Sequence, residues 1–364
     1  MKWRRWTHNL SISKRYHYRW VLTVAMVWTL LDFIRFSIFA VVEERVAYPY
    51  LVVNAWLFVL RFLLIFPTSY IMGWLIVFKL KKLFRRFPLW TGMLLKTLIL
   101  CSITFLLYTL LFVFTHLLIY DYTPARTMQE LMAYGADHYR IFNSLGIWVL
   151  IFICTQLVIE VNEKYSPGIF KDILLGKYIT PKEEVKILMF IDLKDSTSIA
   201  EQLGHQKYFL FIKDFIYYAS GALLKWGANI YQYVGDEVVV SWPLTPSNST
   251  ACIQSLLEAR KSLQKQSDYF RTKYGIIPDF RAGLHTGSVM VGEIGTIKKD
   301  LAMSGDAMNT TARIKGAAGE INKKYIVSKD FIDAVNLKEW QAESVGFIEL
   351  KGKENALELF YLKI

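Results

Sequence analysis

Four long apolar segments in the first 161 residues limit most strongly what this chain can fold into. Each approaches or exceeds the roughly 20 residues that a helix needs to cross the hydrocarbon core of a bilayer. The segments are Trp20–Val42, Leu51–Phe78, Thr97–Tyr120 and Leu145–Val161. Tryptophan and tyrosine crowd their ends, which is typical of anchors at the membrane interface. The pattern predicts an α-helical membrane domain with four transmembrane helices over residues 1–161.

The connections between these segments differ in charge. The stretch before the first segment and the connection between the second and third are basic, with Lys2, Arg4, Arg5, Lys14, Arg15, Arg19, Lys79, Lys81, Lys82, Arg85 and Arg86. The other two connections carry Glu43, Glu44, Asp121, Glu130 and Asp137. Basic loops stay on the cytoplasmic side. We therefore expect a multi-pass protein of the inner (plasma) membrane whose N-terminus and C-terminal half are cytoplasmic. No small-residue cleavage site follows the first span, so no cleaved signal peptide is expected.

The basic excess belongs to the apolar half of the chain. Residues 1–161 hold 17 Lys and Arg against 7 Asp and Glu, whereas residues 162–364 hold 26 against 24. A basic surface spread over a soluble domain is the alternative reading, but this excess lies beside the predicted spans. We therefore expect a lipid bilayer, and no nucleic acid, as a partner.

Three charged residues lie inside predicted spans. Asp32 and Arg35 are three residues apart on one helical face, and Arg61 lies in the second span. Intramembrane charges are costly and suggest a functional site. The alternatives are structural, either an ion pair that holds the bundle together or arginine side chains that reach the interface, and a structural role is favoured over a functional site. Pro67 is expected to kink the long second span.

Residues 162–184 read NEKYSPGIFKDILLGKYITPKEE and form the cytoplasmic linker between the two halves. Pro167 and Gly168 break the fourth helix. Ile169, Phe170, Ile173 and Leu174 then recur at helical spacing, which predicts a short amphipathic helix. This helix is either a signal transducer or a plain spacer.

From Val185 to the C-terminus, strands alternate with helices. The expected strands are Val185–Ile191, Ile230–Val234, Val238–Trp242, Phe280–Leu284, Val289–Val291, Tyr325–Val327, Phe347–Leu350 and Leu357–Leu362. The expected helices are Thr197–Leu203, Tyr208–Trp226, Pro246–Tyr274 and Asp306–Ala317. His285, Thr286 and Gly287 join two of the strands. The β-α-β-β-α-β order predicts an α+β domain with a ferredoxin-like core over residues 185–364.

Two carboxylates lie at strand ends. Asp192 ends the first strand, and Asp236 lies at the apex of a hairpin in YQYVGDEVVVSW. Antiparallel pairing of these strands places both at one edge of the sheet, where two close carboxylates share a proton or bind a divalent cation. A capping or turn role is the alternative for Asp236, because aspartate favours both places.

Further polar residues accompany this pair. Asn309 and Arg313 are four apart on a predicted helix, so both face the same way. An amide and a guanidinium can both bind phosphate or sugar oxygens. Lys351 precedes Gly352 in a predicted turn near the C-terminus.

Five ordered blocks resemble the class III nucleotidyl cyclases, over about residues 177–364. The blocks are MFIDLKDSTSIAEQLG, YQYVGDEVV, RAGLHTGSVMVGEIG, SGDAMNTTARIKG and ELKGKENALELFYL. The resemblance implies attack of the ribose 3′-oxygen on the α-phosphorus of a nucleoside triphosphate, which releases pyrophosphate and a 3′,5′-cyclic nucleotide. A membrane-bound adenylate cyclase is the expected function, and a guanylate cyclase of the same family is the alternative.

The resemblance also implies roles for the residues. Asp192 and Asp236 hold two Mg²⁺ or Mn²⁺ ions per active site, Asn309 orients the ribose, Arg313 offsets charge at the α-phosphate and Lys351 binds the terminal phosphates. In this family the two pairs of one site come from different subunits. Because this chain carries both pairs, the resemblance implies a homodimer with two equivalent sites.

The base-selecting positions depart from the family pattern. Adenine-specific members carry Lys, and guanine-specific members Glu, where this chain has Gln232. The partner position is Asp or Thr in adenylyl cyclases and often Cys in guanylyl cyclases, and here it is Ala302. Glutamine can donate and accept, so it rejects neither purine, and alanine has no polar group to read the base. ATP is expected on family frequency, with GTP as the alternative.

Two other functions compete with this reading. A diguanylate cyclase would explain VGDEV, but Val234 replaces the first Gly of its GGDEF signature and the later blocks stay unexplained. A catalytically silent cyclase-like receptor would have lost an essential polar residue, and none is lost here. Glu237 follows Asp236 on the opposite strand face and is expected to be solvent-facing or salt-bridged.

Overall fold

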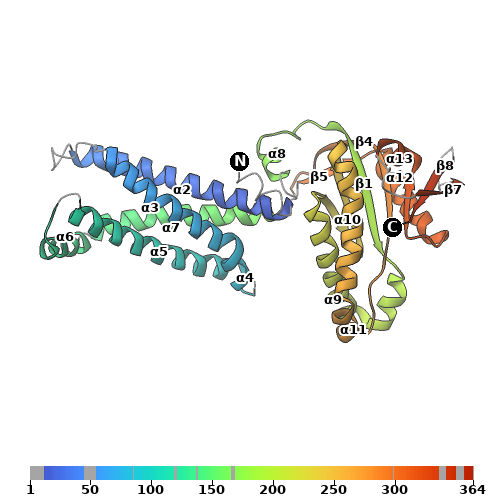
Figure 1. Ribbon diagram of the computed structural model, residues 1–364, viewed down its shortest axis with the longest axis horizontal. Coiled ribbons are helices and arrows are strands. Elements are labelled where there is room, and N and C mark those ends of the chain that lie inside the picture. Colours follow the sequence, from blue (N-terminus) through green and yellow to red (C-terminus); the bar gives the residue numbers. More distant parts are fainter. Residues whose placement is uncertain are drawn as a thin grey trace. The chain divides into compact units, whose positions relative to one another are not determined.

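The computed structural model describes residues 12–44, 55–84, 86–118, 121–136, 138–164, 169–297, 299–335, 342–349 and 356–363. The chain divides into two compact units. One unit comprises Tyr16–Lys164, and the other contains Tyr165–Ile364. The first consists of helices and the second is built around a mixed sheet (Figure 1).

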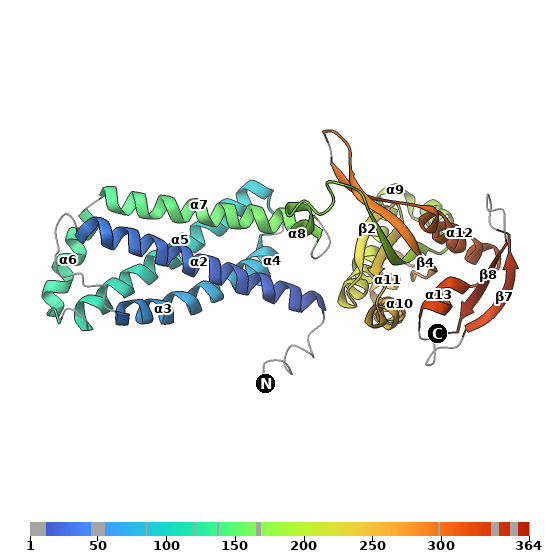
Figure 2. The same ribbon diagram turned by 90° about the horizontal axis from the view of Figure 1, so that it is seen from above.

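Long helices run alongside one another in the first unit (Figures 1 and 2). Its elements are α2 (Ile12–Glu44), α3 (Ala55–Trp74), the π-helical η1 (Leu75–Leu80), α4 (Lys81–Leu83), α5 (Leu89–Leu118), α6 (Pro124–Ala136) and α7 (His138–Glu163). Four stretches are long and apolar enough to cross a membrane: Tyr16–Ile38, Arg61–Leu83, Leu89–Leu117 and Leu145–Asn162. Each overlaps one of the four segments expected from the sequence. Within the expected second and third segments, Leu51–Asn54, Ile119 and Tyr120 lie outside the described residues.

The interior of the bundle combines aromatic packing with a buried ion pair. Trp28 and Phe152 pack at 4.9 Å between ring centroids. The Asp32 carboxylate accepts from Arg61, whose Nε lies 2.7 Å from Oδ2, and from the hydroxyl of Tyr108. Arg35 lies over the Tyr108 ring, 5.0 Å from its centroid. An ion pair, which was one of the two structural alternatives, is therefore present, and Asp32 connects α2 to α3 and α5.

The second span is irregular at a different place from the one expected. The α-helix runs through Pro67 to Trp74, and the hydrogen-bonding pattern then becomes π-helical over Leu75–Leu80. Such insertions into the backbone ladder are, like proline, a recognised cause of helix bending.

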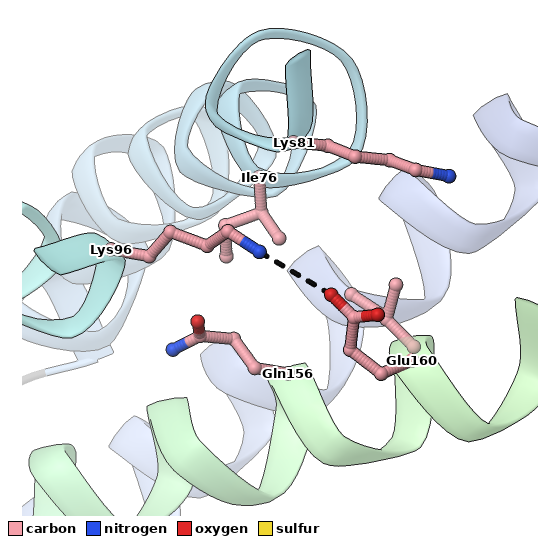
Figure 3. A pocket seen from close by; sticks show the side chains of 6 residues that line it. Ile76, Lys81, Lys96, Gln156 and Glu160 are labelled. Carbon is pink, nitrogen blue, oxygen red and sulfur yellow. Dashed lines mark hydrogen bonds and ion pairs between the residues drawn. The ribbon is translucent and has the colours of Figure 1, made fainter. Parts of the chain in front are cut away.

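A second polar contact joins α5 to α7. The Lys96 ammonium lies 3.4 Å from Glu160 Oε1, and both residues line a cavity of about 10 Å³ with Ile76, Lys81, Gln156 and Ile159 (Figure 3). The buried Gln156 donates through Nε2 to Thr97. Its Oε1 is buried without a partner among the described residues. A cavity of this size holds about one water molecule.

The linker contains the expected short helix, α8 (Ile169–Leu174). Gly176 follows with φ of 72°, and the chain turns toward the sheet. Lys177 then contacts Asp172 and Glu184, each at 3.1 Å. Burial opposes its charge, but these carboxylates and the Tyr178 hydroxyl hold the pKa of Lys177 above its ordinary value. The side chain of Tyr178 is buried against the sheet. The two residues after Gly176 therefore attach the linker to the sheet.

The second unit contains one mixed sheet. Its strands are β1 (Lys182–Leu193), β2 (Asn229–Val234), β3 (Glu237–Pro243), β4 (Phe280–Ile294), β5 (Asp300–Ser304), β6 (Tyr325–Ser328), β7 (Ala342–Ile348) and β8 (Leu357–Leu362). The strand order is β2-β3-β1-β4-β6-β8-β7, and β5 pairs with β4. The antiparallel order β2-β3-β1-β4 is that of a ferredoxin-like core. The predicted combination of four apolar helices and an α+β ferredoxin-like domain is confirmed.

Alternation along β1 separates two cores. Ile187, Met189 and Ile191 pack on the face covered by the large helices, whereas Leu188 packs on the opposite face. The helices are α9 (Ser196–Lys225), α10 (Pro246–Lys265), α11 (Ser267–Tyr274), α12 (Asp306–Glu320) and α13 (Lys329–Ala334). Side chains of α9, α10 and α11 lie in the first core, whereas α12 contributes Ala307 to the second. In the ribbon, α9, α10 and α11 lie on one side of the sheet and α12 on the other (Figure 1). Asp192 follows Ile191 and therefore lies on the face of α12.

Several predicted boundaries are wrong. The two short strands expected around Gly287 are one strand, β4, because Gly287 allows close packing of α12 rather than a turn: a Cβ there would lie 2.7 Å from the Ala307 Cβ. The helix expected over Pro246–Tyr274 breaks at Gln266 into α10 and α11. The strand expected at Phe347–Leu350 lies earlier, as β7. The sequence analysis missed α6, β5 and α13.

Candidate active site

Asp192 and Asp236 come together through the pairing of two neighbouring strands. β1 and β3 are antiparallel, with Ile191 opposite Val238. Asp192 is the next residue of β1, and Asp236 lies in the tight turn between β2 and β3, after Gly235 with φ of 61°. The predicted meeting of both carboxylates at one edge of the sheet is therefore found in the fold.

The electrostatic environment of Asp192 reflects this crowding. Burial is the main cause that raises the pKa of Asp192 above its ordinary value, and the carboxylates of Asp236 and Glu237 raise it further. Lys315 opposes the shift. Burial also raises the pKa of Tyr208 on α9, and both Asp236 and Asp192 add to that shift. The carboxylates of Asp192, Asp236 and Glu237 therefore create a negative electrostatic potential at this edge of the sheet, which attracts cations.

The donor set fits a divalent cation bound together with a phosphorylated substrate. Asp236 Oδ2 is buried and has no hydrogen-bond partner in the described part of the chain. A buried carboxylate oxygen without a hydrogen-bond donor raises the free energy of the folded protein, so we expect this atom to bind a ligand. Across the described ranges, no cluster of three or more His, Cys, Asp or Glu side chains could hold a metal alone. Mg²⁺ is commonly held by one or two carboxylates plus substrate phosphates, which matches the aspartate pair.

Glu237 is salt-bridged, which is one of the two surroundings expected for it. Its Oε2 lies 2.7 Å from the Nζ of Lys315, on α12. The same ammonium lies 3.5 Å from Asp192 Oδ2. Burial by itself lowers the pKa of Lys315, but the two carboxylates outweigh it and raise that pKa.

Lys315 is a site residue that was not predicted from the sequence. A signal for it exists in the helical pattern, because Lys315 follows Ala307 by eight residues and Thr311 by four. It therefore lies on the stripe of α12 that is buried against the sheet. A lone lysine on such a stripe needs a buried partner.

Asn309 and Arg313 lie on α12 as expected, one turn apart. The Asn309 side chain is exposed and that of Arg313 is half-buried. Among the described residues, the partners of Asp192 are Lys315, Asp236 and Glu237, and neither Asn309 nor Arg313 is one of them.

The two candidate base-selecting residues lie on strands that touch. The backbone N–H of Met303 on β5 donates to the hydroxyl of Tyr231 on β2, at 3.0 Å. Gln232 and Ala302 are the sequence neighbours of this bonded pair. A bulge between Ile230 and Gln232 alters the direction of the β2 side chains here. The structure therefore brings Gln232 and Ala302 into one region, while Lys351 lies outside the described residues.

Comparisons with known proteins agree with this architecture. Residues 178–363 match the family described as the adenylate and guanylate cyclase catalytic domain. Adenylate cyclase 2 of Rhizobium meliloti (strain 1021) is 30% identical over 207 residues, which cover 56% of this chain and 57% of that protein. An adenylate cyclase of Anabaena cylindrica is 24% identical over 185 residues, covering 48% of this chain and 36% of that protein. The chain thus spans little more than half the length of the first relative and less of the second.

A solved structure shares the fold. A bacterial light-regulated adenylyl cyclase superposes with a TM-score of 0.53 at 19% identity, covering 60% of this chain and 64% of that one. The identity is low, so this likeness shows the fold alone. The family match spans the sheet, the aspartate pair and α12 together. On that match, the chain belongs to the adenylate and guanylate cyclase catalytic domain family.

Proposed function

We propose that this protein is a membrane-bound adenylate cyclase that converts ATP to 3′,5′-cyclic AMP and pyrophosphate. The observation that carries the proposal is the meeting of Asp192 with Asp236, whose Oδ2 is buried and unpartnered. Both curated relatives described above are named adenylate cyclases, which favours ATP. GTP remains the second candidate substrate, because Gln232 can donate to or accept from either purine.

In the proposed reaction, the ribose 3′-hydroxyl transfers its proton to solvent water and its oxygen forms a bond to the α-phosphorus. The bond from the α-phosphorus to the bridging oxygen breaks, and pyrophosphate leaves. Asp192 and Asp236 would hold two Mg²⁺ or Mn²⁺ ions, which when bound acidify the hydroxyl and offset charge on the triphosphate. Asn309 positions the ribose by hydrogen bonding, Arg313 stabilises charge at the α-phosphate, and Lys351 binds the terminal phosphates.

The proposed active enzyme is a homodimer. Asn309 is exposed on α12 and makes no hydrogen bond to the aspartates among the described residues, which supports a site completed by a second copy. Exposed apolar side chains supply a surface for that copy, among them Phe209 on α9, Val234 on β2 and Ile294 on β4. A two-fold interface then creates two equivalent sites.

The four apolar helices are proposed to anchor the enzyme in the inner (plasma) membrane, with the N-terminus and the catalytic domain in the cytoplasm. Residues 1–161 form the membrane domain and 185–364 the catalytic domain in this proposal. Residues 162–184 transmit a signal between them. Contacts of Lys177 with Asp172 and Glu184 support this role, because they tie α8 to the first strand of the sheet.

The direct test is to incubate the purified full-length chain in detergent with ATP and GTP separately, with Mg²⁺ or Mn²⁺, and to identify the products by mass. Cyclic AMP from ATP, lost in Asp192→Ala and Asp236→Ala, supports the proposal. Cyclic GMP alone favours the guanylate cyclase alternative. No cyclic product from the correctly folded dimer favours the silent receptor.

A further inference from the structure

We propose that Lys315 is a tethered cation that sets the metal affinity of the Asp192 and Asp236 site, and that Glu237 is its anchor. The inference rests on the proposed function, since it assumes that these two aspartates are the metal ligands. Lys315 is then a positioning residue, because it acts on the metal through the carboxylates beside it.

The lysine bridges two carboxylates at unequal distances. Its Nζ lies 2.7 Å from Glu237 Oε2 but 3.5 Å from Asp192 Oδ2. Its side chain is only 21% exposed, and those of Glu237 and Asp192 are 17% and 30% exposed. In such a half-buried place charges are weakly screened by salt, so each charge affects its neighbours strongly. The shorter contact identifies Glu237 as the stronger partner.

The backbone of Lys315 is held in place by the packing of α12 on β4. A Cβ on Gly283 would lie 2.5 Å from the Lys315 backbone nitrogen and 2.8 Å from its Cα. Gly283 pairs with Phe190 on β1, two residues before Asp192. The backbone position of Lys315 is therefore fixed, and its contact with Glu237 restricts how far the ammonium moves toward Asp192.

The charges of the three carboxylates and of Lys315 determine how strongly the site attracts cations. Asp192, Asp236 and Glu237 together carry three negative charges, and Lys315 cancels one. The Glu237–Lys315 pair is neutral by itself, which leaves the two aspartates for the cations. Without Glu237, the ammonium would pair with Asp192 alone and compete with the metal. Without Lys315, Glu237 would become a third free carboxylate at the site.

Opposite effects on metal affinity follow from removing the two partners. Neighbours that orient or tune metal ligands typically change metal affinity by about 10–100-fold. We expect Lys315→Met to tighten Mn²⁺ binding by about 10-fold and Glu237→Gln to weaken it by about 10-fold. The double variant restores the net charge and should bind Mn²⁺ within about 3-fold of the unmodified protein. Lys315→Arg keeps the charge and should also stay close to it.

The experiment measures Mn²⁺ binding directly, without nucleotide and without turnover. The full-length protein in detergent is titrated with Mn²⁺, and the free ion is followed by its electron paramagnetic resonance signal. Lys225→Met is the matched control, because Lys225 makes an ion pair of the same 2.7 Å length with Glu258, between α9 and α10. That variant should leave Mn²⁺ affinity unchanged. Thermal unfolding of each variant verifies that the fold is intact.

The outcomes separate this inference from the proposed function. Asp192→Ala should abolish the titrated site. If it does and Lys315→Met leaves affinity unchanged or weakens it, the inference about Lys315 is wrong and the metal assignment stands. If Asp192→Ala binds Mn²⁺ normally, both are wrong. If Lys315 instead bound the triphosphate, the KM for ATP would rise in Lys315→Met with no change in Mn²⁺ affinity, which also overturns the inference. Should Lys315→Met fail to fold, Glu237→Gln and Lys315→Arg carry the same test.

Discussion

Arg61 and Asp32 join α3 to α2 through a two-bonded ion pair. The Nε of Arg61 lies 2.7 Å from Asp32 Oδ2, and its Nη2 lies 3.1 Å from Oδ1. The Asp32 residue is fully buried, and Tyr108 on α5 donates to the same carboxylate. Three helices of the apolar bundle therefore meet at one carboxylate, which would lose two hydrogen bonds from a cation if Arg61 were removed.

Arg61→Met should destabilise the helical bundle by about 3–5 kcal/mol, because it breaks a buried ion pair by removing the partner that makes two hydrogen bonds to Asp32. The double variant Asp32→Asn with Arg61→Met removes both charges and should recover much of the loss. Thermal unfolding in detergent measures the effect. An Arg61→Met protein as stable as the unmodified one would show that the ion pair does not contribute to the stability of the bundle.

Asp192→Ala and Asp236→Ala should each reduce cyclase activity by at least about 10²–10³-fold, because each removes a carboxylate that positions charge at the reacting phosphate. Glu237→Gln should keep much of the activity at saturating metal. Asp268→Ala, at a side chain that is 96% exposed on α11, is the control. Product formation by chromatography measures all four. Activity that survives in both aspartate variants would contradict the metal assignment.

Mixing two inactive chains should restore activity if the site is shared between subunits. In a mixture of Asp236→Ala and Asn309→Ala chains, half of the randomly formed dimers are mixed, and each has one intact site. The expected activity is about a quarter of that of the unmodified protein. Differently tagged chains, purified over both tags, isolate the mixed dimer for assay. No recovery in that dimer would contradict the shared-site proposal.

Base preference should respond to Gln232 and Ala302 together. Gln232→Lys with Ala302→Asp places the adenine-type pair of the family in the region where β2 contacts β5, and should raise the preference for ATP over GTP by about 10–100-fold. Gln232→Glu with Ala302→Cys should move it toward GTP. The ratio of kcat/KM for the two nucleotides is the measurement. An unchanged ratio in both variants would place base selection elsewhere.

The surroundings of Asp214, on α9, predict that the stability of the second unit depends on pH. Its carboxylate accepts from Tyr269 at 2.7 Å, Tyr274 at 2.6 Å and Lys273 at 2.8 Å. Burial raises the pKa of Asp214, but these hydrogen bonds outweigh it and hold the pKa below its ordinary value. The stabilisation is therefore fully present above the unfolded pKa of about 3.9 and is lost as pH falls through the lower native value.

Asp214→Asn should accordingly cost about 1–2 kcal/mol near pH 7, and this difference should shrink toward zero as the pH falls below about 4. Unfolding midpoints of both proteins across pH 3–7 measure it. Asp268→Asn is again the control, since Asp268 lies on α11, the helix that carries the partners of Asp214, and is almost fully exposed. A difference that stays constant with pH would show that ionisation of Asp214 does not contribute.

The sequence predicted the site best where local pattern and chemistry agree. Asp192 follows a buried strand and Asp236 lies in a hairpin turn, so strand pairing alone brings them together. The helical pattern could have placed Lys315 on the buried stripe of α12, but its partners Asp192 and Glu237 come from β1 and β3, which the spacing along one helix does not indicate. Gly287 was misread as a turn residue for the same reason, because the contact that requires a glycine comes from Ala307, twenty positions later.

The placement of β5 was also beyond local reasoning. Asp300–Ser304 is short and has few β-branched residues, so its strand character comes from pairing with the end of β4. Ala302 was identified only through the resemblance to the cyclases. Its approach to Gln232 depends on the hydrogen bond from Met303 to Tyr231, a contact between residues 72 positions apart.

The contact of α12 with β4 through Gly283 and Gly287 has a consequence for regulation. Because a Cβ on Gly283 or Gly287 would lie only 2.5 Å or 2.7 Å from atoms of α12, the helix is packed tightly on the strand. Asn309, Arg313 and Lys315 are thus held against the same sheet as Asp192. In the proposed homodimer, a stimulus is therefore expected to move the sheet and α12 of each subunit together, so that turnover depends on how the two subunits are aligned.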